Sequence, residues 1–170
     1  MKTFNLRSAK LRSGEEYRDE VELELTPLVY GGQRYLPVPE SPDAAFGMSR
    51  ASTGTLFHLA FEGSLVGPCV RCLVDAVVRV RVDATEYQAA APDSDELRTP
   101  YLADDRLDLS AWARDAVALS LPDKILCREE CAGLCAGCGA NLNHEPCTCP
   151  PPEPDSRFAK LAGLRDKLES

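Results

Sequence analysis

The spacing of cysteines constrains this chain more than any other feature. Six of its eight cysteines fall within the 23 residues from Cys127 to Cys149, and the other two form the C-x-x-C motif Cys69–Cys72. We expect no export signal, because the first residues lack an apolar segment. In a reducing compartment, clustered cysteines indicate a metal site rather than disulfides. Zn²⁺ held tetrahedrally by four thiolates, each at about 2.3 Å, is the expected occupant.

Eight cysteines suffice for two four-thiolate sites, and the spacing suggests how they divide. A C-x-x-C pair at Cys135 can meet the later C-x-C pair through an eight-residue loop, whose closure costs little chain entropy. We therefore predict one zinc site at Cys135, Cys138, Cys147 and Cys149, and a second at Cys69, Cys72, Cys127 and Cys131. A rival division places Cys127, Cys131, Cys135 and Cys138 on one ion and leaves His144 to join Cys147. Both predicted sites would be structural, since four thiolates leave no position open for water.

The charge of the chain limits how it could contact nucleic acid. A formal net charge of −8 argues against binding through bulk electrostatic attraction. Any contact with RNA would have to be local, through the basic residues Lys2, Arg7, Lys10, Arg12, Arg71, Arg79 and Arg81. No run of about 18 apolar residues exists, so we expect no membrane span, and we predict a cytoplasmic protein.

Alternating apolar and polar residues predict a mainly antiparallel sheet. The alternation is found in three segments, residues 19–30, 55–66 and 73–88. Residues 31–54 are rich in Gly and Pro and are predicted to be mostly loop, as is the acidic segment 89–108. Since the second and third strands flank Cys69–Cys72, they predict a hairpin with the two cysteines at its tip.

A helix is predicted over residues 110–121, where apolar residues recur at helical spacing. Ser110 is the expected N-cap and Trp112 the expected core anchor. The predicted fold class is therefore α+β. It consists of a β-rich domain with one packed helix at 1–122, a cysteine-rich zinc-binding module at 123–150, and a Pro-rich spacer with a C-terminal helix (155–168) at 151–170.

Four motifs along the chain occur together in one known family. They are Cys69-Val-Arg-Cys72-Leu73, the helix from Asp108-Leu109 to Ala118-Leu-Ser-Leu-Pro122, the run Cys127…Cys131-Ala-Gly-Leu-Cys135-Ala-Gly-Cys138-Gly-Ala-Asn-Leu-Asn143, and Phe158-Ala-Lys-Leu-Ala-Gly-Leu164. With these motifs the chain resembles the YceD family, also described as large ribosomal RNA subunit accumulation proteins. The resemblance implies a non-catalytic role in ribosome biogenesis, in the synthesis, processing or accumulation of 23S ribosomal RNA. Its implied partner is a ribosomal RNA precursor or a large-subunit ribosomal protein.

Catalytic interpretations fit only parts of the sequence. Pro68-Cys69-Val-Arg-Cys72 matches half of the zinc deaminase signature, but the His-x-Glu half is missing because Leu59 and Ala60 follow His58. A thioredoxin-like C-x-x-C belongs near a βαβ pattern, and a Cys–His nucleophile would need His144, inside the predicted zinc module. We therefore predict no enzyme activity and no small-molecule substrate. The remaining alternative is a zinc-stabilised protein–protein adaptor unrelated to ribosomes.

Overall fold

The computed structural model describes residues 2–150, and the predicted helix at 155–168 lies outside the described residues. In chain order its elements are β1 (Thr3–Asn5), α1 (Leu6–Ala9), β2 (Glu16–Glu22), β3 (Leu28–Tyr30), β4 (Gln33–Val38), β5 (Asp43–Arg50), β6 (Gly54–Pro68), β7 (Asp75–Ala89), the 3₁₀ turn η1 (Asp95–Leu97), β8 (Leu102–Ala103), β9 (Arg106–Asp108) and α2 (Leu109–Ser120). The chain divides into two compact units between Glu129 and Glu130. Neither described helix is long and apolar enough to cross a membrane.

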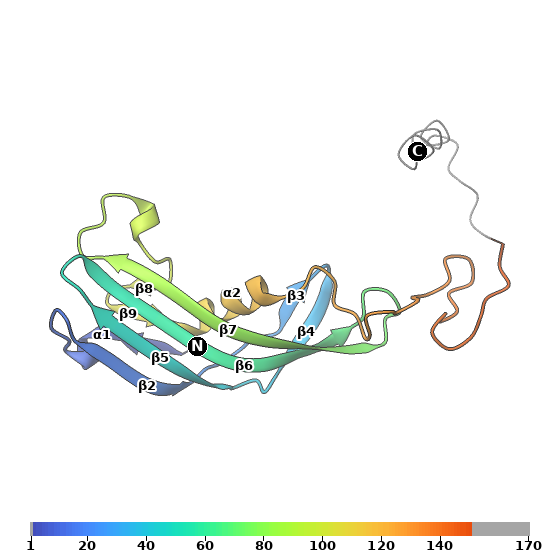
Figure 1. The fold of residues 1–170 in the computed structure, drawn as a ribbon, viewed down its shortest axis with the longest axis horizontal. Helices are drawn as coiled ribbons and strands as arrows, with labels where there is room; N and C mark the ends of the chain where they lie inside the picture. The colour runs from blue at the N-terminus through green and yellow to red at the C-terminus, as the bar shows by residue number, and fades with distance from the viewer. Residues whose placement is uncertain (1, 151–170) are drawn as a thin grey trace, which may run out of the picture. The chain divides into compact units, whose positions relative to one another are not determined.

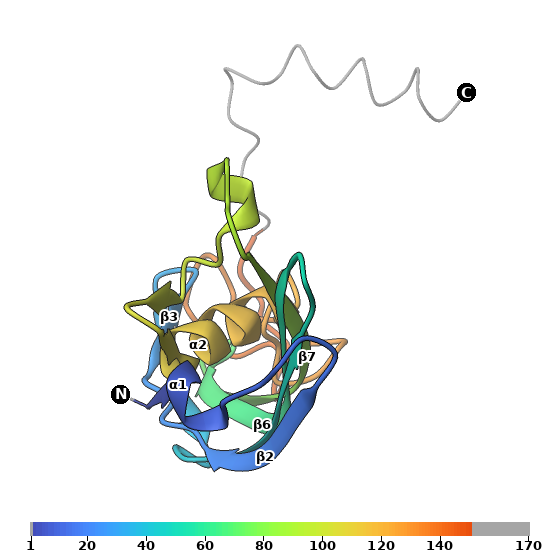
Figure 2. The same cartoon turned by 90° about the vertical axis from the view of Figure 1, so that its left-hand side faces the viewer.

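A six-stranded antiparallel sheet organises the first unit (Figure 1). The order β2-β5-β6-β4-β3 places β6 in the middle, and β7 pairs with the other edge of β6 along its whole length. One end of β6 pairs with β5 and the other end with β4. The sheet curves around α2, which packs against β7 (Figure 2). The predicted α+β architecture, with a mainly antiparallel sheet and one packed helix, is confirmed.

The core lies between this sheet and α2. Alternate residues of β6 point inward, so that Phe57 and Leu59 are fully buried, while Val80 and Val82 of β7 are almost fully buried. Trp112 of α2 is 2% exposed and stacks on Tyr101 at 6.3 Å between ring centroids, as expected for a core anchor. Each fully buried side chain of this size contributes about 1.5–3 kcal/mol of transfer free energy. The hydrophobic effect therefore fixes which face of the hairpin receives the helix.

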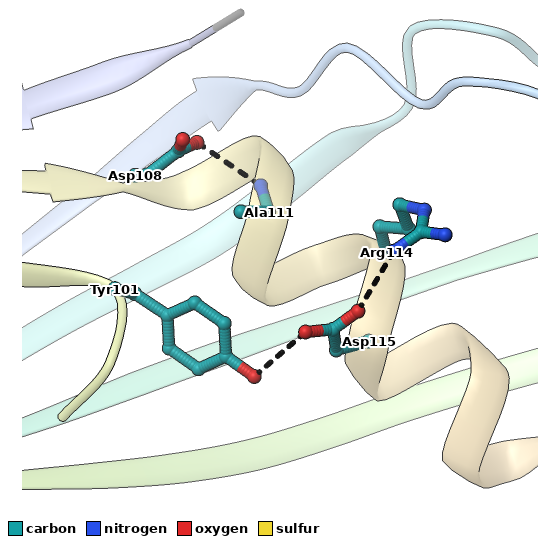
Figure 3. Close-up of polar contacts among 5 residues, drawn as sticks. All are labelled: Tyr101, Asp108, Ala111, Arg114 and Asp115. Carbon is teal, nitrogen blue, oxygen red and sulfur yellow. Dashed lines mark hydrogen bonds and ion pairs between the residues drawn. The ribbon is translucent and has the colours of Figure 1, made fainter.

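The start of α2 differs from the prediction at its cap. Asp108, not Ser110, is the N-cap, and its carboxylate accepts a hydrogen bond from the Ala111 N–H at 3.0 Å (Figure 3). The helix begins earlier because Leu109 is buried, with 1% exposure, and so belongs to its packed face. The Ser110 hydroxyl instead accepts a hydrogen bond from the Lys2 N–H at 2.9 Å.

The prediction of loop over residues 31–54 is wrong, because β4 and β5 both lie there. In β5, Ala44, Phe46 and Met48 are buried and alternate with more exposed residues, as a half-buried strand requires. Glycine and proline are tolerated in these strands: the Cβ of a residue at Gly47 would lie 3.6 Å from the His58 Cβ, which is ordinary contact.

Two further boundaries differ from the sequence prediction. Residues 19–30 do not form one strand, since β2 ends at Glu22 and pairs with β5, whereas β3 begins at Leu28 and pairs with β4. The predicted loop at 89–108 contains η1, β8 and β9. Strand β9 pairs with both β1 and β8, so this segment forms a second, three-stranded sheet that leads directly into α2.

Candidate metal centres

The turn between β6 and β7 is built to present two cysteines. The Cys69 N–H donates to the Val74 carbonyl at 2.8 Å, and the Leu73 N–H donates to the Cys69 carbonyl at 3.0 Å. Cys69 is fully buried and Cys72 is 4% exposed, so the hairpin tip turns its thiols inward rather than to solvent. The Tyr35 hydroxyl donates to the carbonyl of Pro68 at 2.9 Å and fixes the end of β6.

The segment after α2 brings further cysteines to this turn. The Val70 N–H donates to the Ile125 carbonyl at 3.0 Å, and Ile125 is buried. Two residues later, the Cys127 sulphur lies 3.5 Å from the Cys72 sulphur. The sulphurs of one set of four cysteines, here called the hairpin site, all lie within 4.8 Å of one another: Cys69, Cys72, Cys127 and Cys131.

Hydrogen-bond donors surround the sulphurs of the hairpin site. The Arg71 N–H points to the Cys69 sulphur at 3.5 Å. Burial raises the pKa of Cys69, but the N–H groups of Cys72, Arg71 and Cys127 and the Cys72 thiol together outweigh it and lower the pKa to about 6. The Asn143 amide donates to the Cys131 sulphur at 3.3 Å. Such donors favour thiolate, the form in which cysteine binds metal.

The turn after Cys135 is shaped like the hairpin tip. The Gly139 N–H donates to the Cys135 carbonyl at 2.9 Å, and Gly139 has a φ of 75°, which a residue with a side chain rarely adopts. The Gly137 N–H points to the Cys135 sulphur at 3.4 Å, as the Arg71 N–H does to Cys69. The two C-x-x-C motifs therefore share one local geometry, in which the third residue donates to the sulphur of the first.

The later C-x-C pair closes onto this turn. The Cys147 sulphur lies 3.3 Å from that of Cys135 and 3.4 Å from that of Cys138. All four sulphurs of this second set, the loop site, lie within 4.8 Å of one another: Cys135, Cys138, Cys147 and Cys149. The N–H of Cys138 lowers the pKa of Cys135 to about 6, whereas a hydrogen bond with the Cys147 thiol raises the pKa of Cys149 to about 12. The protons shared among these thiols are those that a metal ion would displace.

Both sets have the composition and size of four-thiolate metal sites. A tetrahedral ion with bonds of about 2.3 Å places its sulphurs about 3.8 Å apart, close to the contacts seen here. None of the eight cysteines, all of which lie within residues 2–150, forms a disulfide: the sulphur–sulphur contacts of 3.3 to 3.5 Å far exceed a disulfide bond of about 2.05 Å. The two groups could hold metal ions. They divide the cysteines as the spacing suggests, and His144 belongs to neither group; their role as ligands stays a prediction.

The seven basic residues predicted to contact RNA lie on three separate segments, and all are exposed. Lys2, Arg7, Lys10 and Arg12 belong to the N-terminal arm around β1 and α1, Arg71 to the hairpin turn, and Arg79 and Arg81 to β7. Carboxylates face both Arg7 and Arg81. Arg7 lies 2.6 Å from Asp105, and Arg81 lies 3.6 Å from Glu62.

Comparison with known families matches residues 57–165 to the family described as "Large ribosomal RNA subunit accumulation protein YceD". The chain belongs to the YceD family. The matched region contains most of β6, all of β7 and α2, and all eight cysteines. The two candidate metal centres are therefore part of the region that the family shares.

Relatives from bacteria and plants support this membership. An uncharacterized protein of Mycobacterium tuberculosis is 36% identical over 109 residues, which cover 61% of this chain and 53% of that protein. A chloroplastic protein of Zea mays named "Large ribosomal RNA subunit accumulation protein YCED homolog 1" is 43% identical over 116 residues, 68% of this chain and 32% of the relative. The protein of that name from Arabidopsis thaliana is 36% identical over 63 residues, 37% of this chain and 20% of the relative. The chain thus spans about half the length of its mycobacterial relative and less of the plant ones, and no solved structure matches it.

Proposed function

We propose that this chain is a non-catalytic factor in ribosome biogenesis that supports the accumulation of 23S ribosomal RNA. The family match over residues 57–165 carries the proposal, and the printed names of the plant relatives support it. The cysteines, which could otherwise suggest catalysis, are gathered into two sets of four. Thiolates committed to a closed metal site are poor nucleophiles, so the cysteines have a structural role.

Both sites hold structural Zn²⁺ in this proposal. Thiolate ligands in a tetrahedral arrangement suit zinc, and four of them leave no position for a reactive water. Each site adds −2 to the formal charge, from +2 for the ion and −4 for the thiolates. The charge of −8 would therefore become −12, and contact with RNA stays local or depends on a partner protein.

Local RNA contact is best served by basic side chains that form no ion pair with a carboxylate of the described residues. Arg7 and Arg81 are each matched by an acid. The side chains of Lys2, Lys10 and Arg12 lie on the N-terminal arm, are exposed and form no such pair within residues 2–150. Since few phosphates would be neutralised, the logarithm of the RNA-binding constant should fall only slightly as the logarithm of the salt concentration rises.

Purification of the tagged chain from cells tests the ribosomal role. We expect co-purified RNA to be enriched in 23S precursors over 16S RNA. Reversing the charge of Lys2, Lys10 and Arg12 should reduce this enrichment, whereas reversing three exposed arginines elsewhere should not: Arg18, Arg34 and Arg50. Recovery of proteins without 23S precursors would refute the ribosomal role and favour the adaptor. Equal enrichment with both triple variants would refute the basic-arm contact alone.

Metal analysis tests the zinc assignment. Protein made in zinc-replete cells should carry two zinc ions per chain. Because the two sets share no cysteine, Cys138→Ser should lower this to about one, and so should Cys72→Ser, while the double variant should carry none. A reduced wild-type protein without zinc would overturn the assignment. Loss of both ions in either single variant would show that the sites are not independent.

A further inference from the structure

Strand β7 is an open edge of the six-stranded sheet. It pairs with β6 from Gly54↔Ala89 to Pro68↔Asp75, and no described strand pairs with its other side. A strand edge of this length is usually covered by another segment or occupied by a binding partner, because its unpaired N–H and C=O groups can bond to another strand. The edge of β7 therefore needs either a cover or a partner.

The hydrogen-bond pattern shows which residues offer these groups. At one end of the hairpin the Cys69 N–H bonds to Val74, and at the other the Ala90 N–H bonds to Thr53 at 2.9 Å. Hydrogen-bonded and non-hydrogen-bonded residue pairs alternate in an antiparallel ladder. Both of these bonds therefore indicate that the even-numbered residues of β7 form the backbone hydrogen bonds with β6. The odd-numbered residues direct their backbone groups to the open edge, among them Arg81, Asp83 and Thr85.

A groove runs beside this part of the edge. It has a volume of about 380 Å³ and lies between β7 residues 81–86 and the side chains of Tyr101 and α2. Helix α2 contributes the apolar residues Trp112, Ala116 and Leu119 to its lining. Leu119 is 88% exposed, although it belongs to the helix that packs on the sheet. A helix facing an open strand edge is the arrangement in which PDZ and PTB domains bind extended peptides by strand addition.

Carboxylates flank the groove: Glu86 lines it from β7, and Asp115 of α2 lies beside its lining residue Tyr101 and also contacts Arg114 at 3.2 Å. The Tyr101 hydroxyl donates to the Asp115 carboxylate at 3.2 Å (Figure 3). Burial raises the pKa of Tyr101 to about 12, and the negative charges of Asp115 and Glu86 add to this effect. Both carboxylates therefore act on the same point of the groove. The one basic residue of the lining, Arg81, is already matched by Glu62 at 3.6 Å.

We propose that this groove binds a basic, extended segment of a partner protein, which adds as a strand to the open edge of β7. The N–H and C=O groups of Arg81, Asp83 and Thr85 bond to its backbone. Its lysine or arginine side chains meet Glu86 and Asp115, and the aliphatic stems of these side chains cover Leu119. The same carboxylates repel nucleic-acid phosphates. This binding is independent of the proposed role in ribosomal RNA accumulation and of metal, so either can fail without the other.

Fluorescence polarisation with the full chain and labelled octapeptides tests the proposal. The lysine–valine alternating peptide should bind, and the glutamate–valine alternating peptide should not. A lysine–valine peptide with N-methylated valines keeps the charge but loses ladder hydrogen bonds, so it should bind at least roughly tenfold more weakly. Equal binding of the methylated peptide would refute strand addition. Displacement of the unmethylated peptide by a single-stranded RNA of equal length, at equal concentration, would refute the choice of a protein partner.

Two variants of the protein locate the binding site. Leu119→Arg places a positive charge beside the groove and should weaken binding of the lysine–valine peptide by roughly tenfold. Val29→Arg makes the same change at a 70% exposed position of β3 and should leave binding unchanged. Thr85→Pro removes an edge N–H without removing a bond to β6 and should also weaken binding. Equal affinities of the two arginine variants for the lysine–valine peptide would refute the groove as the binding site. If the wild-type protein is a dimer and Thr85→Pro converts it to a monomer, the edge of β7 is occupied by a second copy of the chain. That result would overturn the proposal.

Discussion

Replacing Gly67 with alanine should strain the end of β6 next to the hairpin site. A Cβ there would lie 2.4 Å from Cδ1 of Tyr35 and 2.8 Å from the carbonyl oxygen of Arg34, so something must shift. The tyrosine ring is fully buried, and its hydroxyl bonds to the Pro68 carbonyl at 2.9 Å, so moving it costs packing and a hydrogen bond. Overpacking of this kind costs about 1–3 kcal/mol. With the loss of one hydrogen bond, we expect unfolding free energy to fall by about 2–4 kcal/mol.

Gly63→Ala in the same strand is the matched control. A Cβ at Gly63 meets only the Val38 carbonyl oxygen at 3.8 Å and Cγ2 of Val80 at 3.9 Å, which is ordinary contact. Alanine there should change the free energy by no more than about 1 kcal/mol, in the stabilising direction. Urea unfolding, followed by the fluorescence of the single tryptophan, Trp112, gives both values in the presence of zinc. Equal midpoints for the two variants would contradict the close approach at Gly67.

Three other changes test local features of the structure. Asp108→Ala should lower the unfolding free energy by about 1 kcal/mol through loss of the helix cap, and Ser110→Ala should lower it less; urea unfolding that ranks them the other way would restore Ser110 as the cap. Titration of phenolate absorbance should show Tyr101 ionising near pH 12, so its contribution to stability is complete below pH 10 and is lost as the pH rises towards 12; Asp115→Asn should lower this pKa. Asn143→Ala should accelerate zinc transfer to a chelator by roughly tenfold, and an unchanged rate would show that its amide does not support a ligand.

The long hairpin was accessible to sequence reasoning because its pattern is local. Phe57, Leu59 and Phe61 alternate along β6, and Val80 and Val82 repeat the period in β7. Period two is the signature of a strand with one buried face. The antiparallel pairing followed from the short connection, which leaves no room for a crossover.

Strands β4 and β5 were missed because composition outweighed pattern. Gly and Pro mark turns on average, yet Pro37 lies in β4 opposite Leu65, and Gly47 lies in mid-strand opposite His58. The alternation of Ala44, Phe46 and Met48 was present in the sequence and would have predicted β5. The pairing of β9 with β1 could not be predicted, since the two strands are about 100 residues apart in the sequence.

The two cysteine sets differ in how they can be predicted. The loop site lies within 15 residues, so chain connectivity alone keeps its thiols close. Proximity of Cys72 to Cys127 depends instead on the contact between Val70 and Ile125, which no local pattern encodes; only the count of eight cysteines suggested it. The hydrogen bond from the Asn143 amide to the Cys131 sulphur was not predicted from the sequence.

One hairpin carries both the cysteine turn and the open edge, but the two features are too far apart to act on each other directly. From Asp75, at the turn, to Asp83, beside the groove, eight residues of strand span roughly 26 Å. The turn is held by buried thiols and by the bond from Cys69 to Val74, whereas the groove depends on side chains of α2 and on free backbone groups. A metal ion at the turn would therefore stabilise the strand that presents the edge without contacting what binds there. Positions separated by more than about 10 Å contribute almost additively, so the metal sites and the groove are separable properties of the same fold.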